Sequence, residues 1–336
     1  MNSGGPADQL LYEARAHIAS GAWSAVRDLL RGHEPEVRSR PELITLLGEA
    51  LLRTHAPRDA CGWLENANTD LARAGDRSAI RRATNLVGAA RFEMGDLDDA
   101  ELAFESALNL GREDGDDLLL ARAMNNLGMI ANVRGRHANA LALYRLAIPS
   151  YQRLGQARGL AETYHNLAIT FREMGELRRA EECERRAMEF AREAPDARLV
   201  AMAQVGLAEL QLHRGDAALA EVQAHRGAAA FARIEDPKGE ADALRLAGAA
   251  ALSLAKHDAA DTALARAVEL ASTAGYALVE GEARRVQAAV ALARGDADRA
   301  RITAAGALTT LERAGATRQA RELRTWIATH IPEPHD

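Results

Sequence analysis

Residues 120–147 read LARAMNNLGMIANVRGRHANALALYRLA, two apolar stripes joined by a short turn at Gly135. The first stripe consists of Leu120, Ala123, Met124, Leu127 and Ala131. These residues recur every three or four positions, as on one face of an α-helix, and a second stripe with the same spacing follows the glycine. Glycine suits the left-handed conformation in which helices commonly end. The stretch therefore predicts a hairpin of two helices.

The turn recurs every 40 residues along the chain. Its positions are Gly95, Gly135, Gly175, Gly215, Ala255 and Gly295, with His55 and Gly21 as earlier equivalents. Each turn has a small residue seven positions before it, and most have an alanine five positions after it, so the two helices can approach closely. Nothing in the sequence requires a β-strand, and the prediction is an all-α solenoid of about eight helix-turn-helix units over residues 8–314.

The expected units are 8–33, 41–74, 76–112, 116–155, 157–194, 197–234, 237–274 and 277–314. Residues 316–331 carry an amphipathic pattern and are expected to form a helix that caps the last unit. Residues 1–7 and 332–336 are expected to be flexible tails. Pro149 falls inside the second helix of the fourth unit and predicts a bend there, because proline removes one backbone donor.

In several units an aromatic residue or a leucine stands four positions after the alanine that follows the turn by five positions. These residues are Leu64, Phe104, Tyr144 and Leu264. Together with the turn glycine and the small residues, this pattern resembles the tetratricopeptide repeat. The period of 40 resembles the extended arrays of kinesin light chains, spindle adaptor proteins and bacterial peptide-responsive regulators. The resemblance implies a right-handed superhelix whose first helices line a concave groove.

Composition and charge exclude several classes of protein. The 336 residues carry a formal net charge of −6, which argues against a partner that is a nucleic acid. No stretch has the length and apolarity of a membrane span, and the N-terminus lacks the layout of a signal peptide, so we expect a cytoplasmic protein. The abundance of alanine and arginine suggests a bacterial gene of high GC content. Cys61 and Cys183 lie in different units and are expected to stay unpaired.

No motif of an active site or a cofactor site is present in the sequence. The ten histidines show no zinc-binding spacing, and neither a phosphate-binding glycine loop nor a nucleophile elbow occurs. We therefore predict a protein that is not an enzyme and that binds neither a metal nor a cofactor.

The resemblance also implies which residues face the groove: those two, three, six, nine, ten and thirteen positions before each turn. In the three central units these positions hold a polar cluster and are the predicted contacts for a peptide or protein. They include Arg82, Asn85, Arg122, Asn125, Asn126, Met129, Asn132, His165, Asn166, Ile169, Arg172 and Glu173. The same positions in the C-terminal units are more apolar.

Asparagine is a weak helix former, so four of them in one arc require a reason. A side-chain amide can donate to a backbone carbonyl and accept from a backbone N–H, and can therefore hold an extended peptide. Asn126 and Asn166 resemble the asparagines with which kinesin light chains and spindle adaptors grip such peptides, although asparagines that bridge neighbouring helices would produce the same pattern. We expect a scaffold or adaptor; the alternatives are a peptide-sensing regulator of a separate partner and a self-associating homo-oligomer.

Overall fold

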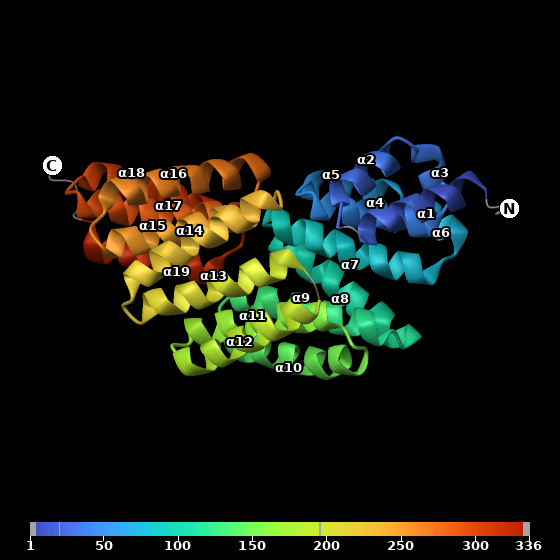
Figure 1. Cartoon of the computed structure of the whole chain (residues 1–336), viewed down its shortest axis with the longest axis horizontal. Helices are drawn as coiled ribbons and strands as arrows, with labels where there is room; N and C mark the ends of the chain where they lie inside the picture. The colour runs from blue at the N-terminus through green and yellow to red at the C-terminus, as the bar shows by residue number, and fades with distance from the viewer. Residues whose placement is uncertain (1–4, 20, 195, 332–336) are drawn as a thin grey trace. The chain divides into compact units, whose positions relative to one another are not determined.

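The prediction of an all-helical chain is confirmed by a computed structural model that describes residues 5–19, 21–194 and 196–331 (Figure 1). This part of the chain contains nineteen α-helices and no strand. It divides into two units, residues 1–123 and 124–336, and the division falls inside helix α9. Each unit is described separately below. Residues 332–336 and most of the predicted N-terminal tail lie outside the described residues.

The first unit begins with a helix at Pro6, inside the predicted tail. Its helices are α1 (Pro6–Ala19), α2 (Trp23–Arg31), α3 (Glu34–Arg38), α4 (Pro41–Arg53), α5 (Pro57–Asn66), α6 (Asn68–Ala74), α7 (Arg77–Met94) and α8 (Leu97–Asp114). The sequence pattern did not indicate α3, and the second helix expected in unit 41–74 is divided at Ala67 into α5 and α6.

The second unit is more regular. It contains the end of α9 (Asp117–Val133), then α10 (His137–Arg153), α11 (Ala157–Glu173), α12 (Leu177–Glu193), α13 (Ala197–His213), α14 (Ala217–Arg233), α15 (Pro237–Ser253), α16 (His257–Ala274), α17 (Ala277–Ala293), α18 (Ala297–Arg313) and α19 (Thr317–His330). Sequential helices pack as antiparallel neighbours, and the first helices of the hairpins, α11, α13, α15 and α17, also pack against one another in a layer. α10 continues as a helix through Pro149, which is exposed.

Every predicted turn residue adopts a left-handed backbone conformation, with φ of +73° at Gly135 and +56° even at Ala255. A second series of left-handed residues, which the sequence analysis missed, lies midway between these turns. It comprises Gly75, Gly115, Gly155, Glu235, Gly275 and Gly315. The turn that joins two hairpins is therefore built like the turn inside a hairpin, and in the second unit each helix with its turn takes about 20 residues.

The small residue seven positions before the turn makes room for a side chain from the second helix. A Cβ atom added at Gly128 would lie 2.5 Å from the ring of Tyr144, and one at Gly248 would lie 2.5 Å from Leu264. In the first unit Gly88 receives Phe104 in the same way. In these hairpins a large side chain of the second helix thus packs over a point of the first helix that has no Cβ.

Candidate functional site

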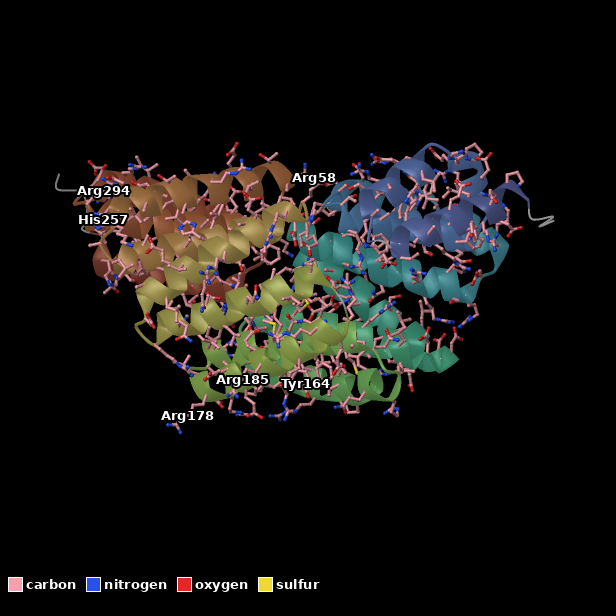
Figure 2. The ribbon with its side chains drawn as sticks, viewed as in Figure 1. Arg58, Tyr164, Arg178, Arg185, His257 and Arg294 are labelled. Atoms are coloured by element: carbon pink, nitrogen blue, oxygen red, sulfur yellow. The ribbon has the colours of Figure 1, made fainter. Side chains whose placement is uncertain are left out.

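The predicted groove residues belong to both units. Arg82, Asn85 and Arg122 lie in the first unit and the other nine in the second. We call the side of α11, α13, α15 and α17, and of α9 from residue 124, that carries the predicted groove positions the first-helix face, because this is the face expected to be concave. Figure 2 shows the side chains of the described residues.

In the first unit, Arg82 is held by an acidic partner. Its guanidinium lies 2.5 Å from Glu49, which also pairs with Arg53. Burial acts to raise the pKa of Glu49, but the two arginines outweigh it and hold that pKa at about 2. Asn85 is buried, whereas Arg122 is exposed. Arg82 would therefore have to exchange Glu49 for any acidic ligand group.

In the second unit, amide side chains connect neighbouring first helices. Asn166 donates a hydrogen bond to the side-chain oxygen of Asn125, with a separation of 3.1 Å between N and O. Thr170 donates in the same way to Asn132, at 2.8 Å. Asn125 and Asn132 are buried, so these amides link α9 to α11. The side-chain oxygen of Asn166 accepts no hydrogen bond from the residues that the structure describes.

Charged side chains continue this arrangement across the next helices. Arg172 on α11 lies 2.9 Å from Glu209 on α13, and Arg245 on α15 lies 3.1 Å from the other oxygen of Glu209. Asp242 in turn contacts Arg245 at 2.8 Å. Burial acts to raise the pKa of Glu209, but Arg172 and Arg245 outweigh it and lower the pKa. These four charged side chains are therefore already paired with one another before a ligand binds. Apolar side chains of the same face, such as Ile169, are only half-buried.

His165 is anchored by a buried carboxylate that the sequence analysis missed. Its Nδ1 lies 2.9 Å from Glu184 of α12, whose side chain is 1% exposed. Burial raises the pKa of Glu184, although His165 opposes the shift. Glu184 occupies the repeat position that holds Tyr144 and Phe104 in other hairpins. A carboxylate in place of an aromatic residue at this position is visible in the sequence and could have indicated the buried carboxylate. The pair fixes the imidazole with Nδ1 directed toward the core.

The C-terminal helix closes one edge of the second unit. Arg318 of α19 lies 2.5 Å from Glu173 at the end of α11, and the other oxygen of Glu173 lies 3.3 Å from Nε2 of His137. Burial raises the pKa of Glu173 to about 7, although Arg318 and Arg172 oppose it. Burial, together with Arg318, lowers the pKa of His137. Burial therefore favours the uncharged form of both groups, the neutral imidazole of His137 and the protonated carboxyl of Glu173.

Glu173→Gln is expected to change how stability depends on pH. A carboxyl whose folded pKa is raised stabilises the fold most while it is protonated, so the wild-type contribution decreases as pH rises from about 4.5 toward 7. Compared with wild type, the variant should therefore gain melting temperature between pH 5 and pH 8. Glu322→Gln, at the exposed second partner of Arg318, is the control and should show a much smaller gain, because Glu322 has only a minor influence on the pKa of Glu173. A variant that becomes less stable relative to wild type with rising pH would contradict this assignment.

The first-helix face of the second unit thus offers three features for a ligand: a partly engaged amide ladder, half-buried apolar side chains and charges that are neutralised in pairs. An extended peptide presents both backbone donors and acceptors and apolar side chains, which is the chemistry this combination can satisfy. Within residues 5–19, 21–194 and 196–331 no group of three or more histidine, cysteine, aspartate or glutamate side chains could hold a metal. Cys61 and Cys183 are free and buried, as expected. None of the described helices is both long and apolar enough to cross a membrane.

Comparison with known proteins agrees with this architecture. The tetratricopeptide repeat pattern matches residues 119–193, and none of the curated proteins matches the sequence. The match covers less than a quarter of the chain, and the described residues have the fold of a tetratricopeptide-type helical solenoid.

Several solved structures have the same fold. A Rap protein complexed with competence and sporulation factor is 13% identical, with a TM-score of 0.66 over 97% of this chain and 100% of the other. NprR in complex with its cognate peptide NprX is 15% identical, with a TM-score of 0.60 over 76% of this chain and 75% of the other. The Cut9–Hcn1 hetero-tetramer of APC/C is 14% identical, with a TM-score of 0.63 over 94% of this chain and 56% of the other.

Proposed function

We propose that the second unit binds an extended peptide segment along its first-helix face, without catalysing a reaction. The observation that carries this proposal is the amide ladder of Asn125 and Asn166, in which the side-chain oxygen of Asn166 accepts no hydrogen bond from the described residues. Asn126 occupies the equivalent repeat position on α9, 40 residues earlier, and is half-buried. Two half-buried amides at this spacing suit a backbone that runs across the helices.

The paired charges define what kind of peptide this face prefers. Arg172 and Arg245 are already neutralised by Glu209, and displacing such a buried partner is costly. A strongly charged ligand therefore gains little here. We propose that the ligand contributes backbone hydrogen bonds and apolar side chains, which would pack beside Met129 and Ile169.

A site for a peptide is compatible with two classes of protein, an adaptor and a regulator. The regulator alternative is supported by the likeness to the Rap protein, solved with competence and sporulation factor, and to NprR, solved with its cognate peptide. The Rap likeness extends over nearly the whole of this chain. We therefore propose that peptide binding controls the interaction of this chain with a separate protein, and we retain the constitutive adaptor as the second candidate.

The combined substitution Asn126→Ala and Asn166→Ala tests the site. Peptides would be selected on immobilised wild-type protein from a random-sequence display library, and their affinities measured by fluorescence anisotropy. Losing two partly buried hydrogen bonds should cost about 2 kcal/mol, or roughly 30-fold in Kd. Removing the Asn166 amide also leaves Asn125 without that donor, so a modest decrease in melting temperature is expected.

Asn139→Ala is the matched control, because Asn139 is an exposed asparagine on α10, outside the first-helix face. It should leave the affinity of the selected peptides unchanged. Selected peptides that bind the double variant as tightly as wild type, or a library that yields no binder, would argue against this site.

A further inference from the structure

A cleft opens in the second unit on the side of α11 opposite the first-helix face. It runs between α10 and α12 and consists of two adjoining pockets of about 370 and 240 Å³ that share Tyr164, Glu182 and Arg186. Tyr164 and Arg185, which line its larger part, are labelled in Figure 2. Because a helix turns by about 100° per residue, Tyr164 and Phe171 lie on the side of α11 away from Asn166.

The floor of the cleft is aromatic. Tyr164 and Phe190 stack with 5.7 Å between ring centroids and 9° between ring planes, and Phe171 lines the adjoining pocket. Aromatic residues make up only 4% of this chain, so three of them at one cleft are a local concentration. Flat aromatic surfaces suit an apolar or aromatic side chain of a ligand.

The rim of the cleft is positively charged. Four arginines line the two pockets, against two carboxylates, Glu182 and Glu189. The arginines are Arg145, Arg179, Arg185 and Arg186. This local excess contrasts with the net charge of −6 of the whole chain, so an acidic ligand is attracted here while the rest of the surface repels it.

The guanidinium groups of Arg179 and Arg186 are oriented by the aromatic floor and also pair with Glu176 and Glu182, whereas those of Arg145 and Arg185 are only weakly engaged by acids. Arg179 lies 3.9 Å above the centroid of Phe171, and Arg186 donates to the hydroxyl of Tyr164 at 3.1 Å. Arg145 has no ion pair among the described residues, and Arg185 lies 4.0 Å from Glu181 with two thirds of its side chain exposed. An exposed ion pair of this kind contributes little to stability. Arg185 can therefore exchange Glu181 for a carboxylate of a ligand, which an arginine can bind through two parallel hydrogen bonds.

From these observations we propose that the cleft between α10 and α12 is a second binding site, for an acidic peptide segment that also carries an aromatic side chain. The ligand carboxylates pair with Arg145 and Arg185, and the aromatic side chain lies on the floor made by Tyr164 and Phe190. The cleft faces away from the first-helix face. A protein partner that carries the acidic segment can therefore bind in the cleft while a peptide occupies the other side of α11.

The probe is a fluorescein-labelled peptide of repeated Glu-Glu-Phe, and its binding to the full chain is followed by anisotropy. Arg145→Glu with Arg185→Glu should weaken binding about tenfold or more, because two attractions become repulsions. The matched control is Arg178→Glu with Arg192→Glu, which changes the net charge equally at exposed positions of α12 that do not line the cleft. It should change the affinity by less than about threefold, a residual long-range charge effect.

Two further measurements make the proposal specific. A polyglutamate probe without phenylalanine should bind more weakly than the Glu-Glu-Phe probe, and Asn126→Ala with Asn166→Ala should leave the binding of the Glu-Glu-Phe probe unchanged. Equal losses in the two charge-reversal variants, equal affinity for polyglutamate, or no binding to wild type would overturn the proposal. The melting temperatures of the two charge-reversal variants should match that of wild type, since the substituted arginines are all exposed: Arg145, Arg178, Arg185 and Arg192.

Discussion

Replacing Glu209 by alanine is expected to destabilise the second unit by about 3 to 5 kcal/mol. The substitution leaves Arg172 and Arg245 facing one another without the carboxylate that joins them, and their side chains are only 12% and 11% exposed. Two buried guanidinium groups then repel each other where water cannot solvate them well. For a unit of this size the melting temperature should decrease by roughly 10 °C in a thermal melt followed by circular dichroism.

The control for Glu209 is a glutamate whose ion pair lies in solvent. Glu312 pairs with Arg324 at 2.5 Å, but both side chains are about half exposed. Glu312→Ala should therefore change stability by less than about 1 kcal/mol. Equal effects of the two substitutions would mean that the Arg172–Glu209–Arg245 network does not stabilise the first-helix layer.

Gly128→Ala is expected to destabilise the same unit by about 3 kcal/mol, at the upper end of the cost of overpacking. The added methyl group would lie 2.5 Å from Cε1 of Tyr144 and 2.8 Å from its Cδ1. The tyrosine ring is fully buried and rigid, so it cannot move aside without shifting α10. Denaturant unfolding monitored by circular dichroism measures the effect.

The matched glycine for this test is Gly306, which lies inside α18 with its nearest foreign atom 4.0 Å from the added Cβ. Gly306→Ala should stabilise the protein by up to about 1 kcal/mol, because alanine is the better helix former. Opposite signs for the same chemical change would demonstrate that the space over Gly128 is occupied. A neutral Gly128→Ala would show that the hairpins pack more loosely than the structure indicates.

Much of the fold could be predicted from the sequence because single residues, above all the turn glycines, mark each repeat. The left-handed turns at Gly95, Gly135 and Gly175 follow from a backbone conformation that glycine adopts at little cost. The second series of turns, at positions such as Gly115 and Glu235, was not predicted, because the predicted pattern assigned one turn residue to each unit. The division of the second helix at Ala67 has no comparable mark in the sequence.

The candidate site was less predictable. The sequence placed Asn125 and Asn166 at groove positions, but the hydrogen bond that joins them depends on how closely α9 and α11 approach. Glu184 was overlooked because a glutamate in a charged helix resembles a solvated residue until its neighbours are known. The peptide contacts themselves remain predictions, and the library selection described above tests them.

The sequence by itself determined the all-α class, the period and the turn positions, since helix periodicity and glycine conformations are local properties of the chain. Tertiary structure alone decided which polar side chains are paired: Arg318 reaches Glu173 across 145 residues, and Glu209 joins Arg172 to Arg245. The physical reason is that burial and pairing of charges depend on distances between helices, and the repeat pattern specifies which faces meet without specifying which side chains touch.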